Sequence, residues 1–109
     1  INYKRDEKTK AVIIVPDFKE VLNRIQCPVL SINGEKDYVV DWRKTLALYK
    51  ETIGKNNNKK LTIKTFPNGN HGLRKCKTGA SNEVIEKEEF CYGYIETMTT
   101  WLKENGFGR

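Results

Sequence analysis

Residues that bind metals or close disulfides are scarce in this sequence: its 109 residues include one histidine, three cysteines and one methionine. Three is an odd number, so at least one cysteine is expected to stay outside any disulfide within the chain. Long apolar runs are missing too, and no stretch approaches the roughly 20 apolar residues that cross a bilayer. The first ten residues also lack the apolar run of a signal peptide. We therefore expect no membrane span, and the cellular compartment stays open.

The length and composition are those of one small, ordered domain at most. Hydrophobic residues make up 38% of the chain and charged residues 31%, and Trp, Tyr and Phe together supply eleven aromatic side chains for a core. That balance excludes wholesale disorder. The first residue is Ile1 rather than Met, so we expect the chain to be a segment of a longer protein.

Positive charge is concentrated in the middle of the sequence. The formal net charge is +6, and residues 43–77 hold ten Lys or Arg residues against the single acid Glu51. Such a cluster attracts phosphate groups, so a binding module for nucleic acid or another anionic partner is an alternative function. Three of these ten residues fall in residues 54–60, however, which resemble a solvated loop without interleaved aromatic residues. Nucleic acid is therefore not the expected partner.

Apolar spacing predicts a helix and then a strand in the first half of the chain. Residues 16–26 place apolar side chains three and four positions apart, with Asp17 beside the positive helix end. Pro28 ends this helix, and residues 29–32 follow as a mostly apolar strand, as expected inside a parallel sheet. The preceding residues 1–15 show no helical period and are expected to form an arm or the remnant of a lid.

A second helix and a second strand are predicted next. Asp41 is placed to cap a helix that Gly54 closes. Its inner face is expected to comprise Trp42, Leu46, Tyr49 and Ile53. After a polar turn at residues 56–60, residues 61–66 alternate and are rich in β-branched side chains, which predicts a strand.

The last third of the sequence combines a polar segment with a final helix. Residues 74–91 are expected to be a polar insertion, for which surface decoration is favoured over a part in substrate selection. Residues 92–106 are expected to form the final helix, with Gly106 as its end. Its predicted inward side chains are Tyr94, Ile95, Met98, Trp101 and Leu102.

The predicted order is helix, strand, helix, strand, helix. Two strands joined through a helix form a right-handed parallel crossover, so the expected fold class is α/β, with residues 16–73 as its core. Two parallel strands alone leave open edges and lack cover. We therefore expect the sheet to be part of a larger one, with its exposed edges paired by another chain or by the rest of the protein.

Two loops that follow the predicted strands carry the chemistry. The first contains Asp37 shortly after a glycine turn, and the second contains the only histidine, His71, among small turn residues. Open α/β sheets place their sites at the carboxyl ends of parallel strands, and neighbouring strands bring such loops together. An aspartate that accepts the imidazole N–H fixes the ring tautomer and stabilises the cation formed when histidine takes a proton.

These loops resemble the carboxyl-terminal part of the α/β-hydrolase superfamily. Residues 27–37, CPVLSINGEKD, are similar to its segment after the penultimate core strand, and residues 66–71, FPNGNH, to its segment after the last strand. The resemblance covers about residues 18–105. It implies that Asp37 is the acid of a catalytic triad and His71 the general base. It also implies a serine hydrolase that acts on a small-molecule or peptide acyl substrate, although esterase, lipase, thioesterase and peptidase chemistries share this logic.

The nucleophile of that family is missing from the sequence. In that family the catalytic residues follow one another along the chain as nucleophile, acid and histidine, and the nucleophile lies on a G-x-S-x-G elbow. No such motif is present, because Ser31 lies inside a predicted strand and Ser81 follows the histidine. We therefore expect the nucleophile upstream of Ile1 and the isolated chain to be inactive.

Other assignments of the acid and of the thiols remain possible on sequence grounds. Glu35 is the main rival of Asp37 for the acid, whereas Asp41 is better explained as a helix cap. The cysteines allow two arrangements. Cys76 and Cys91 flank one polar loop and could form a disulfide if the protein is exported. A zinc site has ligands of the right types, although no C-x-x-C pair is present; its ligands would be Cys27, His71, Cys76 and Cys91. We expect neither a metal nor a cofactor.

Overall fold

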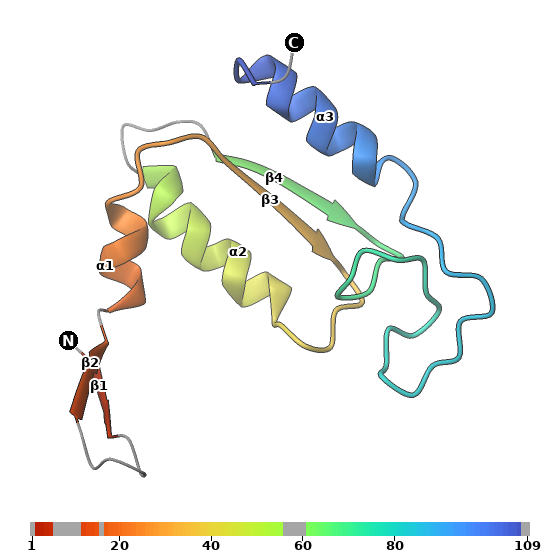
Figure 1. Cartoon of the computed structure of the whole chain (residues 1–109), viewed down its shortest axis with the longest axis horizontal. Coiled ribbons are helices and arrows are strands. Elements are labelled where there is room, and N and C mark those ends of the chain that lie inside the picture. Colours follow the sequence, from red (N-terminus) through yellow and green to blue (C-terminus); the bar gives the residue numbers. More distant parts are fainter. Residues whose placement is uncertain (1, 6–11, 16, 56–60, 108–109) are drawn as a thin grey trace.

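The computed structural model describes residues 2–5, 12–15, 17–55 and 61–107. A pair of parallel strands lies between helix α2 and helix α3 (Figure 1). The elements in chain order are β1 (Asn2–Arg5), β2 (Val12–Val15), α1 (Phe18–Asn23), β3 (Val29–Gly34), α2 (Trp42–Glu51), the 3-10 turn η1 (Ile53–Lys55), β4 (Leu61–Phe66) and α3 (Tyr94–Glu104).

Strands β3 and β4 form the predicted parallel sheet. They pair over their full lengths, with Val29 opposite Leu61 at one end and Gly34 opposite Phe66 at the other. Helix α2 provides the crossover between them, so both strands reach the same sheet edge at their carboxyl ends (Figure 1). In the described part of the chain this sheet has two strands, and its two outer edges are therefore unpaired there.

Helix α1 is shorter than the predicted span of residues 16–26. Its N-cap is Asp17, whose carboxylate accepts from the Lys19 backbone N–H at 2.9 Å. Of the apolar side chains whose spacing predicts this helix, Phe18 is 59% exposed, whereas Leu22 is buried. The apolar period therefore identifies a packing face, of which the described structure covers only a part.

Helix α2 begins where predicted, because the Asp41 side chain accepts from the Lys44 backbone N–H at 3.2 Å. Its end differs from the prediction of a continuous helix closed by Gly54: α2 ends at the C-cap Thr52, and a 3-10 turn follows. The Thr52 hydroxyl donates to the Leu48 carbonyl at 2.7 Å, and that carbonyl also accepts the Thr52 N–H. The backbone leaves regular helical geometry at Thr52, whose φ is −105° and ψ is −78°, and the Lys55 N–H then bonds to the Thr52 carbonyl three residues back.

Helix α3 is two residues shorter at each end than predicted. The predicted stop is confirmed, because Gly106 has φ +83° and donates to the Lys103 carbonyl while Phe107 donates to the Leu102 carbonyl. These two bonds form a Schellman motif. The inward face is only partly covered: Ile95 and Leu102 are nearly half exposed, and no residue of α3 is fully buried.

Few apolar side chains are buried among the described residues. Phe66, Leu73 and Cys91 form one buried cluster. Leu22, Leu46 and Ile53 are buried on α1, α2 and η1. The Cα radius of gyration is 17.3 Å, whereas a compact domain of this length has about 13 Å. The chain is thus more open than a self-contained domain.

The first strands form an antiparallel hairpin where the sequence pattern predicted only an arm. Asn2 lies opposite Val15 in this pairing, and the residues that join the two strands lie outside the described ranges. The predicted polar turn at residues 56–60 also lies outside them. None of the helices that the structure describes is long and apolar enough to cross a membrane.

Candidate active site

The loop after β3 holds the Asp37 carboxylate in a fixed orientation. Its Oδ1 accepts from the backbone N–H groups of Val39 and Val40 at 2.8 and 2.9 Å. The side chain is only 5% exposed. Because two backbone donors occupy one oxygen, Oδ2 is left to face the loop that follows β4.

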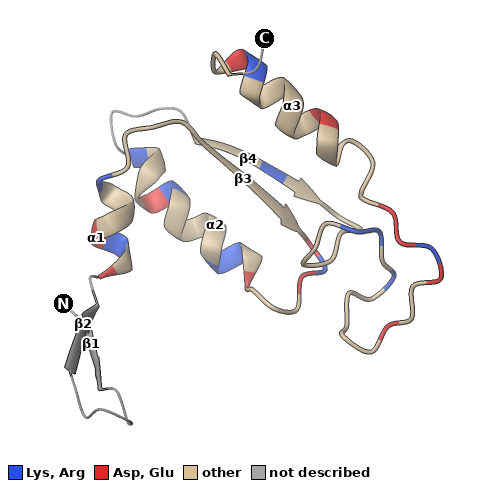
Figure 2. Cartoon of the chain, viewed as in Figure 1, with Lys and Arg blue, Asp and Glu red and all other residues tan. Residues whose placement is uncertain are grey.

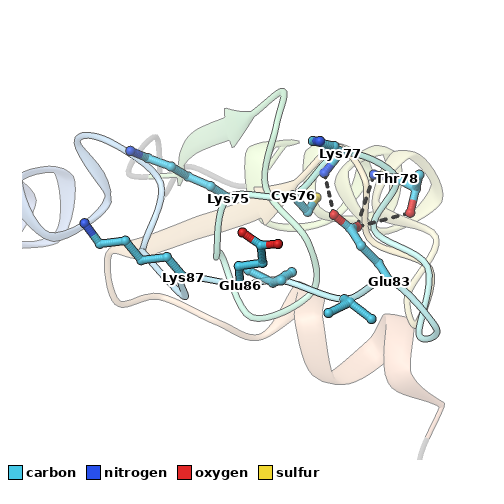
Figure 3. A pocket seen from close by; sticks show the side chains of 9 residues that line it. Lys75, Cys76, Lys77, Thr78, Glu83, Glu86 and Lys87 are labelled. Carbon is cyan, nitrogen blue, oxygen red and sulfur yellow. Dashed lines mark hydrogen bonds between the residues drawn. The ribbon is translucent and has the colours of Figure 1, made fainter.

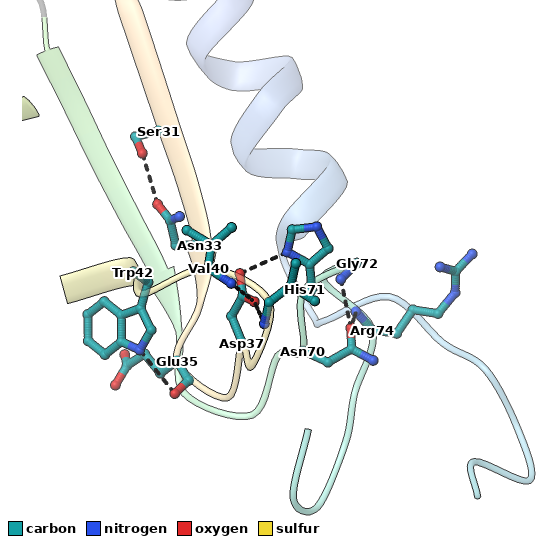
Figure 4. A network of polar contacts seen from close by, with 11 residues as sticks. Ser31, Asn33, Glu35, Asp37, Val40, Trp42, Asn70, His71, Gly72 and Arg74 are labelled. Carbon is teal, nitrogen blue, oxygen red and sulfur yellow. Dashed lines mark hydrogen bonds and ion pairs between the residues drawn. The ribbon is translucent and has the colours of Figure 1, made fainter. Parts of the chain in front are cut away.

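The loop after β4 places His71 at the apex of a tight turn. The Asn70 side-chain oxygen accepts from the backbone N–H groups of Gly72 and Arg74, each at 3.0 Å. The Leu73 N–H donates to the Asn70 carbonyl at 3.1 Å, and Leu73 adopts a left-handed φ of 60° with its side chain buried. Asn70 thus fixes the turn from inside, and His71 projects from it (Figure 4).

The structure brings the two predicted site residues into direct contact. The His71 Nδ1 and Asp37 Oδ2 atoms are 2.9 Å apart. Burial raises the pKa of Asp37, but the hydrogen bonds from His71, Val40 and Val39 outweigh it and hold that pKa below its usual range. An ionised Asp37 accepts the Nδ1 proton, which leaves the Nε2 atom of a ring that is more than half exposed with its lone pair available.

The other two carboxylates of this region are engaged elsewhere. Glu35 Oε2 accepts from the Thr65 hydroxyl at 2.8 Å, on β4. Asp41 caps α2, as predicted. Of the three acids considered from the sequence, Asp37 is the one that contacts His71. Figure 4 shows Glu35 beside Trp42, away from the histidine ring.

Close backbone packing joins the two loops. The N–H of Lys36 donates to the Gly69 carbonyl at 3.0 Å, and its ammonium donates to the Asn68 side chain at 3.1 Å. A Cβ atom added to Gly34 would lie 2.3 Å from the carbonyl oxygens of both Gly69 and Asn70. Glycine is therefore required where β3 ends, because backbone of the histidine loop occupies the space of a side chain.

Replacing Gly34 by Ala is expected to destabilise the protein by about 1–3 kcal/mol, because backbone atoms of the neighbouring loop must move. Gly54→Ala is the matched control, since its nearest new contact is at 3.6 Å, with the Leu61 side chain. Urea unfolding of both variants measures the difference. Equal midpoints for the two variants would contradict the close packing of the loops.

The cysteines do not form the zinc site considered from the sequence. Within the described ranges, no three His, Cys, Asp or Glu side chains gather in a way that holds a metal ion. Cys76 and Cys91 are both thiols, and they line a common cavity of about 420 Å³ next to Phe66 and Tyr92. Burial raises the pKa of each of these two thiols.

Sequence reasoning missed the residues that support the pair. Asn70 and Lys36 were not singled out, although a side chain that can accept two backbone donors directly before a histidine is a turn signal. The contacts of residues 74–91 with the loops after β3 and β4 were missed as well. That segment follows the histidine loop along the chain, and the contacts that tie it to both site loops have no local sequence signature.

In this chain two parallel strands are each followed by a loop, and one loop carries the acid and the other the histidine of a bonded pair. This is the arrangement at the carboxyl-terminal end of the α/β-hydrolase fold, and the chain belongs to that superfamily. Comparison with family models makes the assignment narrower. The model of the prolyl oligopeptidase family matches residues 2–98. The chain is therefore a member of that family of peptidase-like serine hydrolases. Comparisons with curated proteins and with solved structures gave no match.

Proposed function

We propose that this chain supplies the acid and the general base of a serine hydrolase that cleaves an ester or a related acyl bond. The observation that carries the proposal is the 2.9 Å contact between His71 Nδ1 and the ionised, nearly buried Asp37. That contact aims Nε2 away from the acid, toward the exposed side of the ring. Membership of the peptidase-like family supports the same chemistry.

In the proposed reaction, a serine hydroxyl attacks the acyl carbon while His71 Nε2 takes the hydroxyl proton. Asp37 stabilises the imidazolium that forms. The tetrahedral intermediate collapses to an acyl-enzyme when His71 returns the proton to the leaving group. Water then attacks the acyl-enzyme while His71 Nε2 takes a proton from it. When the second tetrahedral intermediate collapses, His71 gives that proton to the serine oxygen, so that the carboxylic acid leaves and the free serine is restored.

The nucleophile in this proposal lies upstream of Ile1. Ser31 is buried within β3, where its hydroxyl donates to the Asn33 side chain at 2.8 Å. Ser81 is an exposed residue of the polar segment. We further propose that upstream residues pair with the open edge of β3 and that they form the oxyanion hole. A cavity of about 320 Å³ lies beside this strand, between it and residues of α1 and α2.

The charge distribution favours this function over a module that binds anions. Lys and Arg residues are scattered over α1, α2, β4 and the polar segment, with acidic residues between them (Figure 2). Several are neutralised locally, as where Lys75 and Lys87 both contact Glu89, at 3.0 and 2.9 Å. In the part of the chain that the structure describes, the basic excess is therefore spread rather than gathered into one binding face.

A fluorophosphonate probe tests the proposed function in the full-length protein. The probe is expected to bond covalently to one serine, with loss of fluoride, and peptide mapping by mass spectrometry should place that serine upstream of Ile1 within a G-x-S-x-G sequence. Heat-unfolded protein is the control, because an unactivated serine reacts slowly. The proposal fails if the folded protein takes up no probe, or if the adduct maps to Ser31 or Ser81.

A further inference from the structure

The polar segment between the histidine loop and α3 is tied to the candidate site. The Cys76 N–H donates to the Asn68 carbonyl at 2.9 Å, and the Cys91 N–H donates to the Leu73 carbonyl at 2.8 Å. Both ends of the segment are thus anchored on the loop that carries His71. A segment that only covered the surface, without a part in the site, would not require these contacts with the histidine loop.

Glu83 organises the middle of that segment. Its Oε2 accepts from the Lys77 N–H at 2.8 Å, and its Oε1 accepts from the Gly79 N–H at 2.8 Å and from both the N–H and the hydroxyl of Thr78 at 3.1 Å. Figure 3 shows the carboxylate directed at this turn beside a cavity of about 590 Å³. The backbone donors of Lys77 and Gly79, joined by those of Thr78, outweigh burial and lower the pKa of Glu83 to about 2.

The turn that Glu83 holds packs closely against the loop after β3, which carries Asp37. Gly79 adopts a φ of +80°, and a Cβ atom placed on it would lie only 1.9 Å from the carbonyl oxygen of Lys36. Lys36 directly precedes Asp37 and is bonded through its N–H to the Gly69 carbonyl. A continuous path therefore runs from Glu83 through the backbone at Gly79 and Lys36 to Asp37, and it reaches the histidine loop as well.

We propose that Glu83 is a positioning residue, which fixes the turn at residues 77–79 against Lys36 and so sets Asp37 at hydrogen-bonding distance from His71. This inference rests on the proposed function and goes beyond it, because it gives the segment after the histidine a part in the catalytic geometry. Without the carboxylate, three consecutive backbone N–H groups lose their acceptor and the turn loosens. The loop that carries Asp37 is then no longer held in place at Lys36 by the backbone of Gly79.

The test is carried out in the full-length protein with Glu83→Ala, with Glu83→Gln as the conservative variant and with Glu86→Ala as the control, an exposed acid on the same segment. Glu83→Ala is expected to lower kcat by about 10- to 100-fold with KM nearly unchanged, because a small misplacement of catalytic groups slows chemistry more than binding. Glu83→Gln, which keeps one acceptor oxygen, should recover part of this loss. Glu86→Ala should behave as the wild type.

The second readout is the NMR signal of the His71 Nδ1 proton, which is visible only while its hydrogen bond slows exchange with water. It is expected to weaken in Glu83→Ala and to persist in Glu86→Ala. If Glu83→Ala does not fold, Glu83→Gln carries both measurements. An unchanged kcat and an unchanged signal in the folded Glu83 variant overturn this inference, whereas a serine adduct that fails to form in the wild type overturns the proposed function instead.

Discussion

Replacing His71 by Ala in the full-length protein is expected to lower kcat/KM for ester hydrolysis by about four to six orders of magnitude. The substitution removes both the proton acceptor for the nucleophile and the donor for the leaving group, and members of a triad act as one unit. Labelling by a fluorophosphonate probe should disappear in parallel. Hydrolysis of a chromogenic ester and gel detection of the probe measure the two effects independently.

The loss in His71→Ala should not come from unfolding. The ring is more than half exposed, and its one described side-chain hydrogen bond joins it to Asp37, so thermal unfolding is expected to shift little. Ser81→Ala is the matched control: it changes an exposed serine of the polar segment and should retain full activity. Undiminished labelling of His71→Ala would contradict the proposed role of this histidine.

Elements whose boundaries depend on local chemistry were predictable. Strand β4 follows from its β-branched side chains, and the start of α2 follows from the capping side chain of Asp41. The end of α3 follows from Gly106. The end of α2 was missed because apolar spacing does not separate a last α-helical turn from the 3-10 turn that the chain forms at Ile53–Lys55. Exposure of Phe18 was missed because an apolar period shows which face can pack, not whether a partner is present.

The pairing of acid and histidine was predictable only in outline. Parallel strands bring the two loops together, but Glu35 and Asp37 are two residues apart and either suits the acid by sequence. What separates them is three-dimensional: the Thr65 hydroxyl of the neighbouring strand binds Glu35, and two backbone N–H groups of its own loop orient Asp37. Glu83 was missed for the same reason, because its effect on the site passes through backbone contacts between distant segments.

An amide at position 37 cannot reproduce what the carboxylate does. The Val39 and Val40 N–H groups both point at Oδ1, so the carbonyl oxygen of an asparagine must take that place. Its NH₂ group then faces His71 Nδ1, where it donates and requires an unprotonated nitrogen. The imidazole proton moves to Nε2, and the atom that should accept the serine proton no longer has a lone pair.

Asp37→Asn is therefore expected to lower kcat by about 10⁴-fold while the fold and KM change little, because the tautomer is wrong and the imidazolium loses its counter-charge. Glu35→Gln is the matched control, since it neutralises an acid two residues away whose partner is the Thr65 hydroxyl; its kcat should stay within a few-fold of the wild type. Steady-state kinetics on one chromogenic ester compare the three proteins. The reverse ranking, with Glu35→Gln inactive and Asp37→Asn active, would move the acid to Glu35. The 2.9 Å contact between Asp37 and His71 favours Asp37→Asn as the inactive variant, because only the acid that holds Nδ1 can govern the proton on Nε2.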